Sequence, residues 1–306
     1  MSEKPLQHRL EYGLFRLLSA VLLVLPEGVA LRLGSVLGWS VGSVLRIRRA
    51  DVERNLEVAF PERPPAWRRR VARASYVHLG REAVALFRLA GMSPTDVVAR
   101  TEIRGLEALQ GAVQEGRGVV VVTGHLGNWE IGGAALSARG LPVDAVAKGM
   151  ANRRFDRDLI ATRERLGMQV VDMGHAHREV LRSLRRGHVV ALVADQNAHK
   201  SDVFVPFFGR LAATHRGPAV FALRSGAPVF VGTCIRRKGS PQRYVVTLEP
   251  LQVKVSGDAD RDVVAVTAAH TALLEEAVRA APEQYFWQHK RWKTRPPEEP
   301  APGGPV

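Results

Sequence analysis

A histidine and a glutamate stand five residues apart, as His125 and Glu130, in the segment VVVVTGHLGNWEIGG that covers residues 119–133. The four valines in front of them are typical of a buried parallel strand, and a helix is expected over 131–139. The pair therefore brackets a turn at the carboxyl end of a strand, where open α/β sheets place their chemistry. A neutral imidazole there can take a proton from a hydroxyl, and a nearby carboxylate can hold the ring in the required tautomer.

We therefore predict that His125 is a general base and that Glu130 orients it. The pattern has the base and its orienting carboxylate but no serine or cysteine nucleophile, so the reacting hydroxyl would belong to the substrate. A base that works at neutral pH should keep a pKa near the ordinary histidine value of about 6.5.

Three further polar residues are candidates for substrate binding. Asn128 either orients the turn or donates to an oxyanion. Arg163 lies at the border of the apolar face of a helix expected over 155–166, from which a guanidinium can reach a phosphate, although Arg165 is a competing choice. Asp195 follows the apolar run 189–194, so it should share the sheet edge that carries His125.

Strand and helix signals alternate through the middle of the sequence, which predicts a mainly parallel sheet covered by helices on both faces. The expected strands are 119–123, 142–147, 169–172, 189–194, 228–235 and 244–248, the last of them an antiparallel or edge strand. The expected helices are 66–89, 131–139, 155–166, 177–186, 218–224 and 263–281. The lone cysteine, Cys234, falls inside an apolar run and is interpreted as a core residue.

The stretch VFVPFFG at 203–209 is unusually apolar for a loop, and its proline argues against a central strand. An apolar loop beside an active site suits an acyl chain, so Phe204, Phe207 and Phe208 are candidate chain-binding residues. The aromatic and basic segment YFWQHKRWKTRP at 285–296 suits a lipid headgroup boundary or an anionic sugar-phosphate, and equally a C-terminal helix packed by its tryptophans.

HLGNWE, followed in order by ADQN at 194–197, VFVPFFG and YFWQHKRWKTRP, resembles the bacterial lipid A biosynthesis (lauroyl/myristoyl) acyltransferases and the related phosphatidylinositol mannoside acyltransferases. The resemblance covers residues 14–296. It implies a glycerolipid acyltransferase-like fold, and a transfer of a fatty acyl group from an acyl carrier protein or coenzyme A thioester to a hydroxyl of a glycolipid such as a lipid A precursor. It implies a role for Arg163 in binding donor or acceptor and a place at the bacterial inner membrane. The basic cluster after Leu45 predicts that the catalytic body lies on the cytoplasmic face of that membrane.

The formal net charge is +14, which implies an anionic partner such as a membrane surface, an acidic protein or nucleic acid. No RNA-binding, zinc-finger or helix-turn-helix motif accompanies the arginines, so nucleic acid is not expected. No metal-ligand spacing and no phosphate-binding glycine motif is present, so neither a metal nor a nucleotide cofactor is expected. Arg182, Arg185 and Arg186 form a candidate docking patch for an acidic carrier protein.

The first 45 residues are rich in leucine and valine but contain Arg16, Glu27 and Arg32. Core helices, an interfacial membrane anchor and a tilted span all remain open for this segment. The predicted organisation is membrane-associated apolar helices at 1–45, an acyltransferase domain at 46–295 and a disordered tail at 296–306. The non-enzymatic alternative is a basic peripheral lipid-binding protein, and a hydrolase that uses water as acceptor also remains open.

Overall fold

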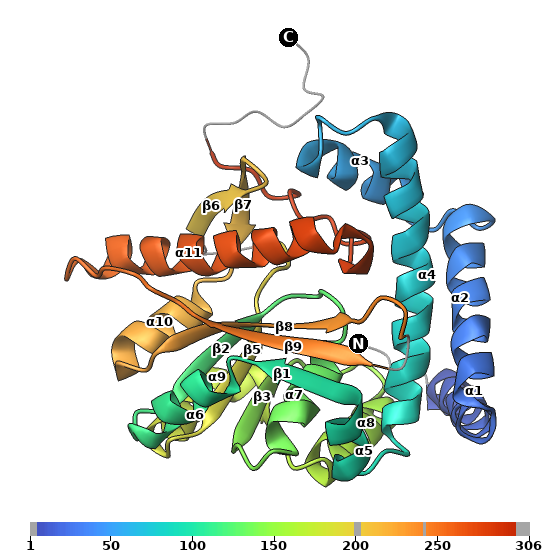
Figure 1. The fold of residues 1–306 in the computed structure, drawn as a ribbon, viewed down its shortest axis with the longest axis horizontal. Coiled ribbons are helices and arrows are strands. Elements are labelled where there is room, and N and C mark those ends of the chain that lie inside the picture. Colours follow the sequence, from blue (N-terminus) through green and yellow to red (C-terminus); the bar gives the residue numbers. More distant parts are fainter. Residues whose placement is uncertain (1–4, 199–202, 241–242, 298–306) are drawn as a thin grey trace.

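The computed structural model describes residues 5–198, 203–240 and 243–297, and its centre is a seven-stranded sheet flanked by helices (Figure 1). The strand order is β1-β9-β8-β2-β5-β3-β4, and every neighbouring pair is parallel except β8 and β9. The strands are β1 Thr101–Arg104, β2 Val119–Thr123, β3 Val143–Ala147, β4 Gln169–Asp172, β5 Val189–Val193, β8 Val229–Arg236 and β9 Tyr244–Pro250. The predicted mainly parallel α/β sheet is thus confirmed.

The apolar runs of the sequence occupy the middle of this sheet because their residues are buried on both faces. Val119 and Val121 of β2 belong to one hydrophobic cluster, whereas Val120 and Val122 belong to the cluster on the opposite face. The strand expected over 244–248 is antiparallel to β8, but it is not an edge strand, because the four-residue strand β1 pairs with its other side. The polar sequence TEIR of β1 gave no strand signal.

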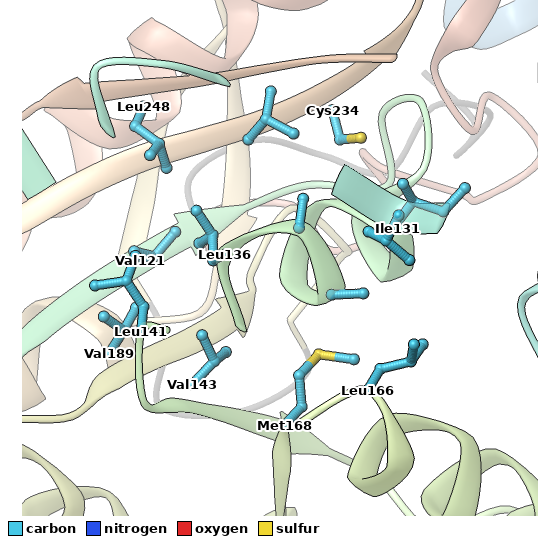
Figure 2. Close-up of a cluster of buried hydrophobic side chains, with 14 of the residues drawn as sticks. Val121, Ile131, Leu136, Leu141, Val143, Leu166, Met168, Val189, Cys234 and Leu248 are labelled. Carbon is cyan, nitrogen blue, oxygen red and sulfur yellow. The ribbon is translucent and has the colours of Figure 1, made fainter. Parts of the chain in front are cut away.

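Helices cover both faces of the sheet. One face holds α5 Pro94–Arg100, α6 Leu106–Gln114 and α7 Trp129–Ser137, and the other holds α9 Ala176–Arg185, α10 Gly217–Ser225 and the start of α11 Ala259–Ala280. Figure 2 shows the packing under α7, where Ile131 and Leu136 meet Leu248 and Cys234. Cys234 is a buried core residue as predicted, and burial raises the pKa of its thiol.

Residues 203–209 form part of a hairpin, so the predicted apolar loop is wrong. Strand β6 (Val203–Phe207) pairs antiparallel with β7 (Arg210–Thr214) in a separate two-stranded ribbon. Pro206 is tolerated because a ribbon leaves one side of each strand without a partner strand. The turn consists of Phe208 and Gly209, whose φ angles of 54° and 71° fit the tight two-residue turn that hairpins favour.

The N-terminal segment forms α1 (Pro5–Val24) and α2 (Glu27–Ser43), followed by α3 (Arg49–Ala59) and the long α4 (Pro65–Leu89). Helix α2 lies along α4 (Figure 1), and glycines at the contact let the two backbones approach closely. A Cβ atom on Gly38 would lie 2.0 Å from the carbonyl oxygen of Tyr76, and one on Gly80 would lie 2.0 Å from that of Gly34. Helix α2 is therefore an integral layer of the fold.

Exposed large apolar side chains are concentrated on α1 and α2. Those of the two helices are Leu6, Leu10, Leu14, Leu17, Leu18, Val21, Leu23, Val24, Val29, Leu33, Val36, Leu37 and Trp39. Within the described ranges, none of the helices combines the length and hydropathy that crossing a bilayer requires. Most of the predicted tail, residues 298–306, lies outside the described part of the chain.

Candidate functional site

The register of the sheet brings His125 and Asp195 together. Strands β2 and β5 are parallel neighbours, and Thr123 of β2 is aligned with Val193 of β5. His125 and Asp195 each follow their aligned residue by two positions, so both leave the carboxyl edge of the sheet at the same level. The equal spacing after two apolar runs is a signal that is present in the sequence alone.

Asp195 holds the imidazole with both of its carboxylate oxygens. Nδ1 of His125 lies 2.7 Å from Oδ1 of Asp195, and the backbone N–H of His125 donates to Oδ2 at 2.9 Å. A carboxylate accepts hydrogen bonds, so Nδ1 carries the proton and the lone pair of Nε2 is directed away from Asp195. The side chain of Asp195 is 3% exposed and that of His125 is 22% exposed. This is the arrangement of a base and its orienting carboxylate.

The electrostatics of the pair favour a charged aspartate beside a basic imidazole. Burial by itself would raise the pKa of Asp195, but the charges of His125 and Arg291 and the two hydrogen bonds lower it. For His125, burial lowers the pKa, but the charge and hydrogen bond of Asp195, with a smaller contribution from the charge of Glu130, outweigh burial, so that the pKa lies above its usual value. The prediction of an unperturbed pKa for His125 is therefore wrong, and its shift is upward.

Three side chains surround the free edge of the imidazole. The ring of Trp129 meets the imidazole edge to face at 4.6 Å between centroids, and that of Phe286 lies at 6.0 Å. The side-chain nitrogen of Gln196 lies 3.3 Å from Nε2, where its N–H can donate to the lone pair. A substrate hydroxyl that gives its proton to Nε2 must displace this amide.

Glu130 does not contact the imidazole, so its predicted role as the orienting residue is wrong. Its carboxylate binds the guanidinium of Arg163, with Nε of Arg163 donating to Oε2 at 2.9 Å and the Nη2 donating to Oε1. Both side chains are 11% exposed. The sequence correctly placed Arg163 on a helix, α8 (Arg153–Arg165), and the structure brings it to the first turn of α7 as the partner of Glu130.

Asn128 lies buried at the start of α7, and its side chain orients the turn. Its Oδ1 accepts the N–H of Ile131 at 2.9 Å, and its Nδ2 donates to Glu82 of α4 at 2.7 Å. Of the two alternatives from the sequence, the turn-orienting one matches these contacts. Gly127, just before it, has a φ of 64°, and a Cβ there would lie 1.9 Å from the carbonyl oxygen of Cys234.

Two of the three phenylalanines of β6 and its turn are buried and offer no exposed surface to an acyl chain. Phe207 and Phe208 are 1% and 6% exposed and belong to a buried aromatic cluster. Their ring partners are Phe60, Tyr285, Trp287 and Trp292. Phe204 is half-buried in the same strand. These contacts give Phe207 and Phe208 a role in core packing.

Residues 285–294 form neither a helix nor a surface patch. They cross the site and connect the loop that carries His125 with the loop that carries Asn197. The N–H of Phe286 donates to the carbonyl of His125 at 3.0 Å, and the N–H of Asn197 donates to Nε2 of His289 at 2.7 Å. Burial lowers the pKa of His289 to about 4, so its ring is neutral and can accept this bond. Its aromatic and basic composition did not indicate this bracing role.

An apolar cavity of about 480 Å³ lies between α1, α4 and α8. Its wall is formed mainly by carbon atoms, with residues such as Phe15, Phe87, Phe155 and Leu159. The charged residues at its rim have partners, since Asp158 binds Tyr12 and Arg16, and Arg165 binds carbonyls at the end of α4. Thr162, also in the wall, adjoins Arg163, so one helix joins the cavity to the site.

Comparison with known proteins identifies the family of this chain. The family described as bacterial lipid A biosynthesis acyltransferase matches residues 3–294. The lipid A biosynthesis lauroyltransferase of Escherichia coli (strain K12) is 30% identical over 280 residues, which are 90% of this chain and 89% of the relative. The lipid A biosynthesis palmitoleoyltransferase of the same organism is 28% identical over 276 residues, 89% and 87% of the two chains.

A phosphatidylinositol mannoside acyltransferase from Mycolicibacterium smegmatis (strain ATCC 700084 / mc(2)155) is 31% identical over 169 residues, 54% of this chain and 55% of the relative. The family match extends over almost the whole chain, including both strands that carry His125 and Asp195. The chain is therefore an acyltransferase and belongs to the bacterial lipid A biosynthesis acyltransferase family.

Proposed function

We propose that this protein transfers a fatty acyl group from an acyl thioester to a hydroxyl of a membrane glycolipid, with the His125–Asp195 pair as its catalytic base. The observation that carries the proposal is the hydrogen bond of Nδ1 to Asp195, which leaves the lone pair of Nε2 for the acceptor hydroxyl. Glu130 and Arg163 act beside this pair by fixing the first turn of α7.

In the proposed reaction, Nε2 of His125 takes the proton of the acceptor hydroxyl while its oxygen attacks the carbonyl carbon of the thioester. The tetrahedral adduct collapses, the carbon–sulfur bond breaks, and the leaving thiolate takes the proton from the imidazolium. Asp195 remains ionised throughout and stabilises the positive ring. The products are an ester and a free thiol, and no acyl-enzyme is formed.

The acceptor we propose is a lipid A precursor, and the alternative is a mannosylated inositol lipid. The two lipid A transferases match 89% and 90% of this chain, which favours the first, while the shorter match to a mannoside acyltransferase, over 54%, keeps the second as a candidate. Incubation of the enzyme with an acyl thioester and each glycolipid in turn, or with no acceptor, separates both from a hydrolase. Thiol release without an acceptor would identify a hydrolase, whereas no thiol release in the presence of either glycolipid would contradict acyl transfer.

The donor we propose is an acyl carrier protein or coenzyme A thioester, without a metal or other cofactor. Arg182, Arg185 and Arg186 are a poor docking patch for an acidic carrier, because α9 ends at Arg185, just before β5 begins. These arginines therefore lie at the amino edge of the sheet, a strand length of roughly 17 Å from the edge that carries Asp195. Arg182 also pairs with Glu179.

We expect His125→Ala to lower the rate of acyl transfer by about 10²–10⁴-fold, because the acceptor hydroxyl loses its base. The measurement is ester formation from a radiolabelled acyl thioester with a glycolipid acceptor. His188→Ala is the matched control, since His188 also pairs with a buried carboxylate, Asp144, but at the amino edge of the sheet. Near-normal turnover by the His125 variant would refute the mechanism.

We expect Asp195→Asn to lower the plateau rate by about 10²–10⁴-fold, because the amide no longer fixes the tautomer with Nδ1 protonated. The pH profile gives a second readout. In the native enzyme the rate should fall as the pH drops through a His125 pKa above 6.5, because only the neutral ring accepts a proton. Without the aspartate charge this limb should move to lower pH, and an unmoved limb would assign it to another group.

We further propose that the acyl chain of the donor occupies the apolar cavity between α1, α4 and α8. Its volume of about 480 Å³ falls within the usual range of ligand pockets, about 300–1,000 Å³. Each buried CH₂ group contributes roughly 0.8 kcal/mol, so an apolar cavity can select chain length. Ala161→Phe, in the cavity wall, should therefore lower transfer of a 16-carbon chain more than that of a 10-carbon chain.

The chain-length test uses one acceptor and a series of thioesters, and it reads the ratio of long-chain to short-chain rates. Ala66→Phe is the matched control, because Ala66 is exposed at the opposite end of α4 from the cavity. An unchanged ratio in the Ala161 variant would place the chain elsewhere.

We also propose that α1 and α2 bind the protein to the membrane surface as an interfacial anchor. The exposed leucines and valines supply apolar contact, and the exposed Arg46 and Arg48 follow them along the chain, where anionic headgroups would attract them. This anchor would hold the site at the cytoplasmic face of the inner membrane. Removal of residues 1–45 is a poor test, because it would also uncover the face of α4 that packs against α2.

We expect the triple substitution of Leu10, Leu14 and Leu17 by serine to move most of the protein from the membrane pellet to the supernatant. These side chains are 59–67% exposed, so the fold should survive the change. Fractionation and circular dichroism provide the measurements. Serine at Val98, Val255 and Val264, which are exposed elsewhere, is the matched control. If the leucine variant still pellets, the basic body surface is the anchor.

A further inference from the structure

Glu82 is a buried carboxylate that the proposed reaction does not use. It lies on α4, and its side chain is 10% exposed. Oε1 accepts Nε of Arg236 at 2.6 Å, while Oε2 accepts Nδ2 of Asn128 at 2.7 Å and the hydroxyl of Tyr244 at 3.0 Å. His78 of the same helix lies 3.5 Å away. One side chain thus joins α4, β8, β9 and the turn that follows His125.

The contact with Asn128 decides how the amide of that residue is oriented. An ionised carboxylate only accepts hydrogen bonds, so Asn128 must present its NH₂ group to Glu82. The carbonyl oxygen of Asn128 then points to the backbone N–H of Ile131, which it caps at 2.9 Å. The burial of Glu82 favours its neutral form, but the positive neighbours and hydrogen bonds outweigh burial and lower its pKa.

The first turn of α7 depends on this cap, and it carries the two residues that border the site. Trp129, at the first helical position, packs on the imidazole of His125, and Glu130 holds Arg163. Rotation of the Asn128 amide would set its NH₂ group against the N–H of Ile131, two donors facing each other. The turn would then shift, and with it the ring that defines one side of the imidazole.

We propose that Glu82 is a positioning residue of the active site, which acts through Asn128 on the first turn of α7 and so on Trp129 and His125. The inference rests on the proposed function only for its kinetic readout. It assigns Glu82 no contact with substrate. Its effect should therefore fall on kcat, because a displacement of about 1 Å at a reacting group can cost on the order of 10²-fold.

The kinetic test compares exchanges between positions 82 and 128. Glu82→Gln leaves one acceptor oxygen for three donors, and Asn128→Asp sets two carboxylates against each other. Each should lower kcat by about 10–100-fold, with KM for the thioester changed by no more than about twofold. The double variant E82Q/N128D restores a donor facing an acceptor, keeps one carboxylate in the cluster and retains the helix cap, so it should recover most of kcat.

Tyr244→Phe is the control for stability. It removes the hydrogen bond that the hydroxyl donates to Glu82 and the one that it accepts from Arg236, but it does not touch Asn128. It should lower the melting temperature without lowering kcat. If the Glu82→Gln variant does not fold, Glu82→Asp replaces it as the test. The aspartate keeps a negative charge for Arg236, but its side chain is one CH₂ group shorter and no longer reaches Asn128. The expected result for Glu82→Asp is a kcat loss like that of Asn128→Asp.

A spectroscopic readout separates this inference from the proposed reaction. The ¹⁹F resonance of 5-fluorotryptophan at position 129, assigned by Trp129→Phe, should shift in Glu82→Gln and Asn128→Asp and return in the double variant. If the native enzyme transfers no acyl group, the proposed function fails but this signal still tests the position of α7. Native kcat in both Glu82 variants, or equal kcat losses in Tyr244→Phe and Glu82→Gln, would overturn the inference, as would a double variant without recovery.

Discussion

The carboxylate of Asp195 is the contact on which the arrangement of the site depends. It receives both the ring Nδ1–H and the backbone N–H of one residue, His125, and thereby fixes the rotation of the ring and the start of the loop together. A buried carboxylate is costly unless such partners and a nearby positive charge stabilise it. Arg291 supplies that charge, and it is held in turn by Ala213 and Thr214 of the hairpin.

This dependence explains why distant parts of the chain converge at one edge of the sheet. The hairpin β6–β7 and the C-terminal segment are remote from His125 in sequence. The hairpin nevertheless binds Arg291 of the C-terminal segment, and His289 of that segment binds Asn197 in the loop of Asp195. Their aromatic residues form the buried cluster that seals this side of the site. The phenylalanines of 203–209 thus serve the site through packing, where the sequence suggested a surface for an acyl chain.

The sequence was most informative for strands that are buried on both faces of the sheet. The apolar runs that became β2, β5 and β8 predicted the centre of the sheet, and their ends predicted the edge where His125 and Asp195 meet. The sequence was least informative where contacts between residues that are distant in sequence determine the structure. Contacts of this kind form the polar strand β1 and the hairpin. They also determine that Asp195, and not Glu130, is the partner of His125. The periodicity of the local sequence does not reveal any of these contacts.

The choice between these two carboxylates follows from the charges around them. Glu130 faces Arg163, a permanent cation that binds it through two nitrogens, so its negative charge is matched at every pH of interest. Asp195 instead has a titrating partner, His125, in direct contact. The charge of Glu130 also raises the pKa of His125, but less than that of Asp195, which contacts the ring directly. By binding Glu130, Arg163 opposes this second contribution and so limits the rise, while Asp195 fixes the tautomer of the ring.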